Sequence, residues 1–305
     1  MRQQTLRREI RVEGKGLHTG RFVTLDLLPA EEGYGICFER TDIQEKSIIP
    51  ALSSLVSCTQ RNTTISLHGV GVATTEHLLA ALYGMGIDNV HIRINGPEVP
   101  VLDGSALPFA QAIQEAGVIK QKDGREYAQI TSPLIYEDEA TGTAIKVLPS
   151  NRFSMSVEID FTPRKIGKQV FLYDEDIHFI KELAPARTFV FLDELIPLLK
   201  KGLIRGGDLD NALVIADGFV SDVDKEWLTR LYGYSVEQWT AGYLNKEGPR
   251  YPNECVRHKT VDLLGDLYLV GKRLKASVQA YKPGHKANVA VAQMIRNHIE
   301  SHENK

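Results

Sequence analysis

Residues 256–267 read VRHKTVDLLGDL, the pattern of a helix that is apolar over much of its surface and polar along one stripe. At helical period His258, Asp262 and Asp266 fall on that stripe. An imidazole and a carboxylate four residues apart can converge on one metal ion, and both are good zinc ligands. The stretch therefore predicts a helix that supplies two ligands, His258 and Asp262, and needs a third from elsewhere.

The candidate third ligand lies far upstream, in ATTEHLLAAL at residues 73–82. A threonine there can cap a helix, and the leucines recur at helical spacing, which places Glu76 and His77 in the first turn. Two histidines and one aspartate leave a fourth position open for water, as in catalytic zinc sites. Glu76 beside a ligand can then take a proton from that water as a general base.

Composition indicates an ordinary globular protein. The chain has 305 residues, 43% hydrophobic and 25% charged, which is enough for two domains. Its net charge of −3 gives no general attraction to nucleic acid or to an anionic membrane. The start has no apolar signal-peptide core, and no run approaches the roughly 18 apolar residues of a membrane span. Cys37, Cys58 and Cys255 are expected to be free thiols. We expect a cytoplasmic monomer without integral membrane association.

Six ordered motifs resemble the UDP-3-O-acyl-N-acetylglucosamine deacetylases of bacterial lipid A biosynthesis. They are TTEHLLAAL (74–82), GPEVPVLDGSA (96–106), PARTF (185–189), GGDLDNA (206–212), VRHKTVDLLGDL (256–267) and YKPGH (281–285). They follow the family's order and, together with GKGLHTG at 14–20, cover nearly the whole chain.

The resemblance implies a reaction and a cofactor. The substrate would be an acylated UDP-sugar, UDP-3-O-acyl-N-acetylglucosamine. Its acetamide would be hydrolysed to UDP-3-O-acyl-glucosamine and acetate, the committed step of lipid A biosynthesis. One Zn2+ would be held by His77, His258 and Asp262, although Fe2+ would fit two histidines and a carboxylate nearly as well. No nucleic acid partner is implied.

The resemblance also implies catalytic roles for residues outside the ligand set. Thr188 in PARTF matches the family residue whose hydroxyl stabilises the oxyanion. His285 follows a Pro–Gly turn, from which a loop can aim it into a cleft as the general acid for the departing amine. Asp266 can orient that imidazole. Lys259 would by default be solvated, and the family match favours contact with the substrate diphosphate or with developing charge.

Residues 186–216 are predicted to form a strand, a helix and a second strand. They could be an ordinary core element. In the resembling family the corresponding insertion forms a hydrophobic tunnel for the acyl chain, which makes Phe189, Phe191 and Leu199 candidates for its lining, with Phe161 as a further substrate contact.

Two more residues are candidates for substrate binding. Lys282 in YKPGH is a candidate for contact with phosphate. His18 lies in a glycine-rich connection between two predicted strands, where it is as easily a locally bonded turn residue as a functional one. In the resembling family this connection borders the active site.

The expected fold class is α+β. Strands followed by helices are predicted on both sides of the polar stretch KQKDGRE (120–126), which is taken as a linker. This predicts a first domain over 1–124 and a second over 125–305, and the resemblance implies that the two are sandwiched with the active site between them.

Residues 222–253 are longer than the corresponding connection in compact family members and carry Trp227 and Trp239. We expect a partly helical surface excursion. Some family members continue into a dehydratase domain, for which these 305 residues contain no counterpart.

Spacing alone leaves other classes of protein open. A His-x3-Asp pair on an amphipathic helix is more often a surface pair or an already satisfied one. A sugar-nucleotide binding module would need Lys259 but not Glu76 together with His285. A structural metal domain would close the fourth coordination position.

Overall fold

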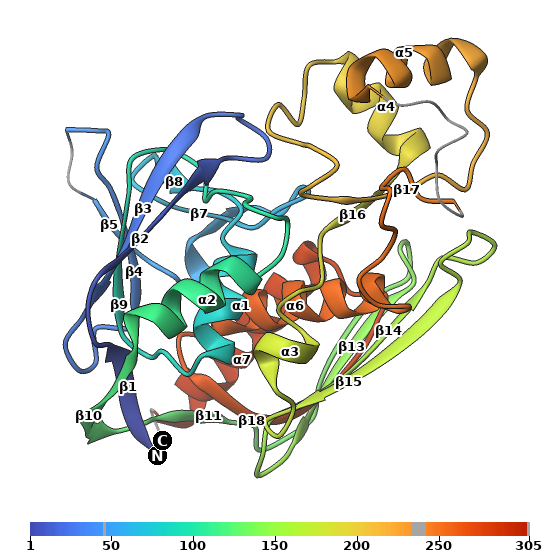
Figure 1. The fold of residues 1–305 in the computed structure, drawn as a ribbon. Coiled ribbons are helices and arrows are strands. Elements are labelled where there is room, and N and C mark those ends of the chain that lie inside the picture. The colour runs from blue at the N-terminus through green and yellow to red at the C-terminus, as the bar shows by residue number, and fades with distance from the viewer. Residues whose placement is uncertain (45–46, 234–241, 304–305) are drawn as a thin grey trace.

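The protein is described by a computed structural model that covers residues 1–44, 47–233 and 242–303. Within these residues it contains seven α-helices and several β-sheets, which confirms the α+β class. Figure 1 shows α1 (Glu76–Gly84), α2 (Leu107–Ala116), α6 (Glu254–Tyr268) and α7 (His285–Glu303) lying between two large sheets, with short α3 (Phe179–Glu182) near them.

The first large sheet has the strand order β2, β3, β9, β4, β5. Only β4 and β9 run parallel, and every other neighbouring pair in this sheet is antiparallel. Val90, Ile92 and Ile94 of β9 are buried, as their alternation predicts. The bounds are β2 Ile10–Lys15, β3 Phe22–Pro29, β4 Ile36–Arg40, β5 Ile48–Pro50 and β9 Val90–Ile94. A smaller antiparallel sheet beside it joins β6 (Val56–Cys58), β7 (Thr64–Leu67) and β8 (Val70–Val72).

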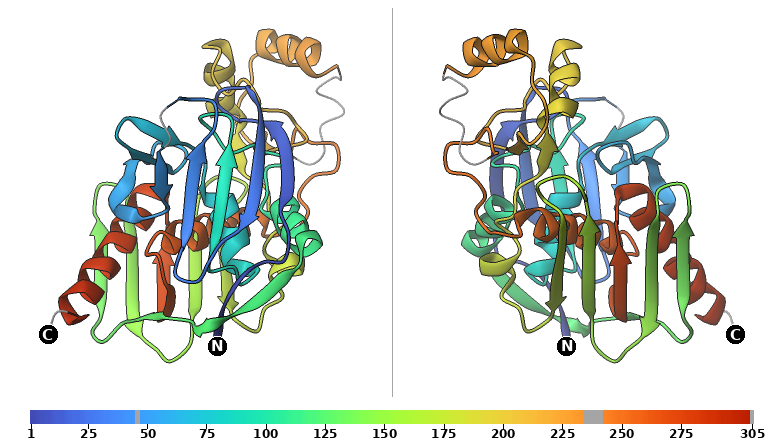
Figure 2. Two further views of the ribbon diagram at one scale, coloured as in Figure 1. Left: turned by 90° about the vertical axis from the view of Figure 1, so that its left-hand side faces the viewer. Right: turned by 90° about the vertical axis from the view of Figure 1, so that its right-hand side faces the viewer.

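The second large sheet has the order β12, β13, β18, β14, β15, with short β11 paired to β18. Strands β14 and β18 are parallel. The long connection between them, which ends with α6, carries the chain back to the end of the sheet where β14 begins. Met155, Val157 and Ile159 of β14 are buried. The bounds are β11 Tyr127–Gln129, β12 Leu134–Asp138, β13 Thr143–Pro149, β14 Ser154–Asp160, β15 Lys168–Asp174 and β18 Arg273–Tyr281. The right-hand view of Figure 2 shows this sheet face-on, with α7 beside it.

The stretch expected to be a linker is part of a strand instead. Strand β10 (Val118–Gly124) pairs antiparallel with β1 (Arg2–Leu6). Its polar side chains are mostly exposed, which gives a loop-like sequence, while its backbone forms hydrogen bonds with β1 at the start of the chain. The division at 124/125 stays a prediction.

Residues 186–216 form the predicted strand, helix and strand, as β16 (Phe189–Phe191), α4 (Leu192–Lys200) and β17 (Leu213–Ile215). The two strands pair in parallel. With α5 (Asp222–Tyr232) they enclose a small apolar core separate from the main one. Figure 1 shows α4 and α5 projecting from the body of the protein.

The excursion at 222–253 is partly helical, as expected, because α5 occupies its start. Trp227 packs against the small apolar core that α4 and α5 share. Trp239 lies outside the described residues. None of the helices in the described ranges combines the length and the apolar character that a membrane span needs.

The centre of the protein is the crossing of α1 and α6. Nearly every residue of both helices is buried. At the crossing Gly265 of α6 faces the backbone of Glu76, and a Cβ at position 265 would lie 2.0 Å from the Glu76 carbonyl oxygen. Real Cβ atoms do not approach backbone so closely, so the absence of a side chain at 265 permits this packing. The crossing places the first turn of α1 against the polar stripe of α6.

Gly265→Ala should therefore destabilise the protein, although alanine normally favours a helix by about 1 kcal/mol over glycine. The clash is with backbone, and overpacking of this kind costs roughly 1–3 kcal/mol or more. Thermal unfolding followed by circular dichroism would show a lower Tm. Gly124→Ala is the matched control, because nothing lies within 4 Å of a Cβ there. An unchanged or raised Tm for Gly265→Ala would contradict the close crossing.

Candidate active site

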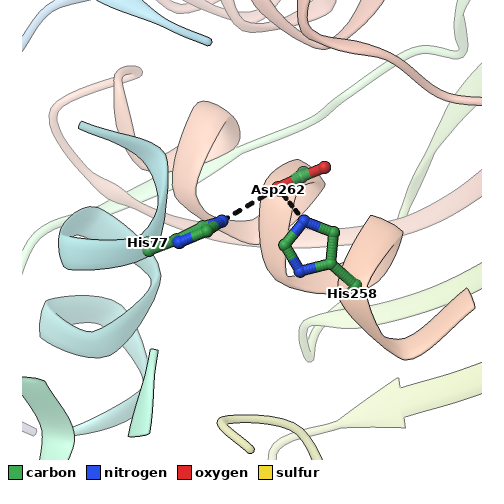
Figure 3. Close-up of side chains that lie close together, drawn as sticks. All are labelled: His77, His258 and Asp262. Atoms are coloured by element: carbon green, nitrogen blue, oxygen red, sulfur yellow. Dashed lines mark ion pairs between the residues drawn. The ribbon is translucent and has the colours of Figure 1, made fainter. Parts of the chain in front are cut away.

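Three side chains meet at the crossing (Figure 3). His77 comes from the first turn of α1, and His258 and Asp262 come from successive turns of α6. Asp262 Oδ1 lies 3.6 Å from His77 Nε2 and 3.3 Å from His258 Nε2. The potential ligand atoms of all three lie within 4.8 Å of one another, and all three residues are buried. The predicted ligand set is thus assembled from two distant parts of the sequence.

The chemistry of this donor set fits a metal ion. His258 Nδ1 donates to the carbonyl of Ala186 at 3.2 Å, and burial lowers the pKa of His258 to about 3. The ring is therefore neutral, and its lone pair on Nε2 faces Asp262 Oδ1. That oxygen is buried and has no hydrogen-bond partner in the described structure. Two lone pairs face each other, an arrangement that a cation between them would stabilise.

Glu76 lies next to the ligand His77 at the start of α1 and is itself buried. Its Oε2 accepts a hydrogen bond from the backbone N–H of Thr63 at 3.0 Å. Burial raises the pKa of Glu76. The result is a carboxylate of increased basicity in the wall of the same cavity as the three ligands.

His285 is the first residue of α7, not a loop residue as the Pro–Gly turn suggested. Its Nδ1 lies 2.9 Å from Asp266 Oδ2, and Asp266 is fully buried on α6. Burial by itself lowers the pKa of His285, but the charge and hydrogen bond of Asp266 outweigh it and raise that pKa to about 9. The imidazole therefore carries a proton at neutral pH.

Lys259 is paired rather than freely solvated. Its ammonium donates to Asp262 Oδ2 at 3.0 Å and lies 5.8 Å from the ring centroid of Phe189. Both oxygens of Asp262 therefore have distinct surroundings, with Lys259 on one and the two histidines around the other. Lys259 lines the cavity.

Thr188 also lines the cavity, from the segment just before β16. Its backbone is fixed on both sides, because its N–H donates to Gly104 and its carbonyl accepts from Leu213. The neighbouring Arg187 forms a buried bidentate pair with Glu254 at the start of α6. This ion pair ties the PARTF segment to the helix that carries His258 and Asp262.

The cavity has a volume of about 250 Å³ and joins the polar centre to the insertion. Phe189, Leu199 and His18 are in its wall, together with apolar residues of α4 and β17: Leu195, Leu198 and Val214. Phe161 and Phe191 are not in its wall but pack against one another at 5.3 Å, and Phe161 contacts Phe189.

Lys282 lies outside the cavity wall. Its ammonium is 5.2 Å from the ring centroid of Tyr281, and its backbone N–H bonds to the carbonyl of Glu158. The structure therefore brings together the ligands, Glu76, Thr188, Lys259 and His285, whereas Lys282, Phe161 and Phe191 are not in the cavity wall.

Sequence reasoning missed Glu98, which holds the GLHTG loop. Glu98 is fully buried and accepts hydrogen bonds from the backbone N–H groups of His18 and Thr19, both at 2.9 Å, and from the hydroxyls of Thr19 and Thr74. A Cβ at Gly16 would collide with it. The signal was a carboxylate in the turn-rich stretch GPEVPVLDGSA, but two of its partners, His18 and Thr19, lie 80 and 79 positions away and Thr74 lies 24 positions away.

Removal and return of metal test the ligand set. A chelated sample should take up one divalent transition-metal ion per chain, and His258→Ala should weaken that affinity by at least roughly 100-fold, because a tetrahedral site loses one of three protein ligands. Titration followed by metal analysis measures both. His91→Ala is the control, since His91 pairs with Tyr34 and Glu39 away from the cavity. Equal affinity in His258→Ala and wild type would contradict the site.

Comparison with known proteins identifies the family. A family model described as "UDP-3-O-acyl N-acetylglycosamine deacetylase" matches residues 3–227 and 236–297. A "Bifunctional enzyme LpxC/FabZ" of Bacteroides thetaiotaomicron is 41% identical over 99% of this chain and 66% of its own length. The chain thus spans about two thirds of that bifunctional relative.

Two relatives of similar size carry the single-function name "UDP-3-O-acyl-N-acetylglucosamine deacetylase". The one from Syntrophotalea carbinolica is 41% identical over 96% of this chain and 87% of its own length. The one from Myxococcus xanthus is 39% identical over 99% of this chain and 88% of its own. This chain therefore belongs to the UDP-3-O-acyl-N-acetylglucosamine deacetylase family.

Proposed function

We propose that this protein hydrolyses the acetamide of UDP-3-O-acyl-N-acetylglucosamine, giving UDP-3-O-acyl-glucosamine and acetate, in lipid A biosynthesis. The observation that carries the proposal is the buried His77, His258 and Asp262 set in one cavity with Glu76 and His285. Amide hydrolysis beside a metal site needs a base and an acid. Glu76, a carboxylate of raised pKa, can be the base, and His285, an imidazole of raised pKa, can be the acid. The names of the relatives supply the substrate.

We propose Zn2+ as the ion that His77, His258 and Asp262 hold. Two imidazoles and one carboxylate match catalytic zinc sites, and they also suit Fe2+. When bound, such an ion acts as a Lewis acid and lowers the pKa of water, which makes water a nucleophile at neutral pH.

Glu76 acts as the general base. It takes a proton from the attacking water as the water oxygen bonds to the amide carbon, and the carbonyl oxygen gains negative charge. The hydroxyl of Thr188 donates a hydrogen bond to that oxyanion. Lys259, paired to Asp262, adds positive charge next to the same region.

His285 acts as the general acid. Its Nδ1 is engaged by Asp266, so its Nε2 is free to give a proton to the sugar nitrogen as the carbon–nitrogen bond breaks. The nitrogen leaves as an amine and the carbonyl carbon leaves as acetate. Water supplies the hydroxyl, and the proton passed to Glu76 balances the one that His285 donates.

The apolar part of the cavity takes the 3-O-acyl chain. Leu195, Leu198 and Leu199 of α4 offer it an apolar wall, and each buried methylene can contribute ~0.8 kcal/mol. Phe161 and Phe191 support Phe189 from behind, His18 borders the polar end, and Lys282 with Lys259 provides positive charge for the diphosphate.

We further propose that the protein works in the cytoplasm as a monomer, with domains over 1–124 and 125–305. Its cysteines are free thiols, which suits a reducing compartment. The substrate is a nucleotide-linked sugar, and such sugars are made inside cells.

Acetate release from UDP-3-O-acyl-N-acetylglucosamine tests the function. The zinc-loaded wild type should turn over, and Glu76→Ala should lower kcat by roughly 100-fold to 10,000-fold, because the general base is gone. Metal content should be equal in both proteins. If a folded, fully metallated wild type released no acetate, the result would contradict the substrate assignment and favour a sugar-nucleotide binding module.

The pH profile of kcat tests the general acid. A raised pKa keeps His285 protonated at neutral pH, and activity should be lost as the pH rises through that pKa. The value is about 9, and a bound dication lowers it. Asp266→Asn removes the charge that raises it, so the basic limb should move to lower pH by about one unit or more. If the basic limb of the kcat profile stayed at the same pH in Asp266→Asn, the result would contradict the role of the Asp266–His285 pair as general acid.

A further inference from the structure

Thr63 lies between the two proton-transfer groups. It precedes β7 and is fully buried. Its backbone N–H donates to Glu76 Oε2 at 3.0 Å, and its hydroxyl donates to Asp266 Oδ1 at 2.6 Å. The same hydroxyl oxygen is 3.3 Å from His285 Nδ1. One residue thus contacts the carboxylates of both the base and the acid pair.

The Thr63 hydroxyl is the donor to one of the two carboxylate oxygens of Asp266. Asp266 is fully buried, and its Oδ2 accepts from His285 Nδ1 and Asn288 Nδ2, both at 2.9 Å. Within the described residues, its Oδ1 has the Thr63 hydroxyl alone. A buried carboxylate oxygen without a donor is strongly unfavourable, so loss of that hydroxyl would favour rotation of the carboxylate away from His285.

Thr63 is itself held in place. Its carbonyl accepts from the backbone N–H of Thr75 at 3.2 Å and from the Thr75 hydroxyl at 3.0 Å. Thr75 directly precedes Glu76 at the start of α1. Thr63 is therefore fixed to the start of α1 through three hydrogen bonds and to α6 through a fourth, so the hydroxyl has little freedom to leave Asp266.

We propose that Thr63 is a positioning residue that fixes the distance and orientation of Glu76 relative to the Asp266–His285 pair, with its N–H on one carboxylate and its O–H on the other. The proposal rests on the proposed function for the roles of Glu76 and His285. Thr63 acts through these groups. Its hydroxyl selects the Asp266 orientation in which Oδ2 meets Nδ1, which leaves Nε2 for the departing nitrogen.

Thr63→Val tests this directly, because valine has nearly the same shape and keeps the N–H to Glu76. Loss of a hydrogen bond to a charged partner should lower kcat by roughly 10-fold to 100-fold, while KM and metal content stay within about twofold. Thr63→Ser, which restores the hydroxyl, should lie within about threefold of wild type. Thr260→Val is the control, because among the described residues the buried Thr260 hydroxyl has one partner, the carbonyl of Val256 within α6.

Three kinetic results would overturn the proposal: wild-type kcat in Thr63→Val, equal impairment in Thr63→Val and Thr63→Ser, or an effect confined to KM or to metal content. A structural role alone would lower the amount of folded, metallated protein and leave kcat per metallated molecule unchanged.

Nitrogen NMR of histidine-labelled, metal-free protein gives a reading that does not depend on turnover. His285→Gln assigns the signal. The Nδ1 proton of His285 should be protected from exchange in wild type and Thr63→Ser, and lose that protection in Thr63→Val. Retained protection in Thr63→Val overturns the proposal whatever the activity. Protection that is lost in Thr63→Val, together with a wild type that releases no acetate, would support the positioning role and contradict the proposed function instead.

Discussion

The close crossing of α1 and α6 at Gly265 is the constraint on which the rest of the structure depends. The Glu76 backbone approaches α6 where a side chain at 265 would collide with it. As a result the first turn of α1 meets the stripe of α6, and His77 reaches Asp262 across the crossing while His258 reaches it along the helix. The pair of helices lies between the two large sheets, and α7 packs against α6.

Such a buried polar centre is stable only if its charges are paired. Asp266 has three donors, Glu254 has Arg187, and Glu98 has two backbone N–H groups and two hydroxyls. Asp262 Oδ1 is the exception, and it faces the nitrogen atoms of two histidines. The fold therefore satisfies its buried carboxylates with protein donors except where a cation fits.

Helical spacing predicted those site residues that lie within one segment of the sequence. His258 and Asp262 follow from the helical period within one segment, and the leucines around Glu76 predicted α1. The insertion followed from its apolar runs. The residues of 73–82 put His77 forward as the third ligand and the family resemblance supported it, whereas Thr188 and the catalytic role of His285 were connected to that helix by the resemblance.

What could not be predicted depends on contacts between distant residues. Thr63 and Glu98 act through hydrogen bonds to backbone and side chains that a sequence does not place, and Thr63 meets Asp266 across 203 positions. Residues 120–126 appeared to be a linker because the pairing partner of β10 is the N-terminal strand. His285 starts a helix, α7, which follows the Pro–Gly turn directly.

The central claim is that the crossing builds an open metal site from two histidines and one aspartate. X-ray absorption at the zinc edge of the zinc-loaded protein tests it most directly. We expect two imidazole nitrogens at roughly 2.0–2.1 Å from the zinc and oxygen ligands at roughly 2.0–2.2 Å from it, with no sulfur ligand. A sulfur ligand at about 2.3 Å from the zinc, or four protein nitrogen and sulfur ligands with no oxygen, would contradict the open two-histidine, one-aspartate site.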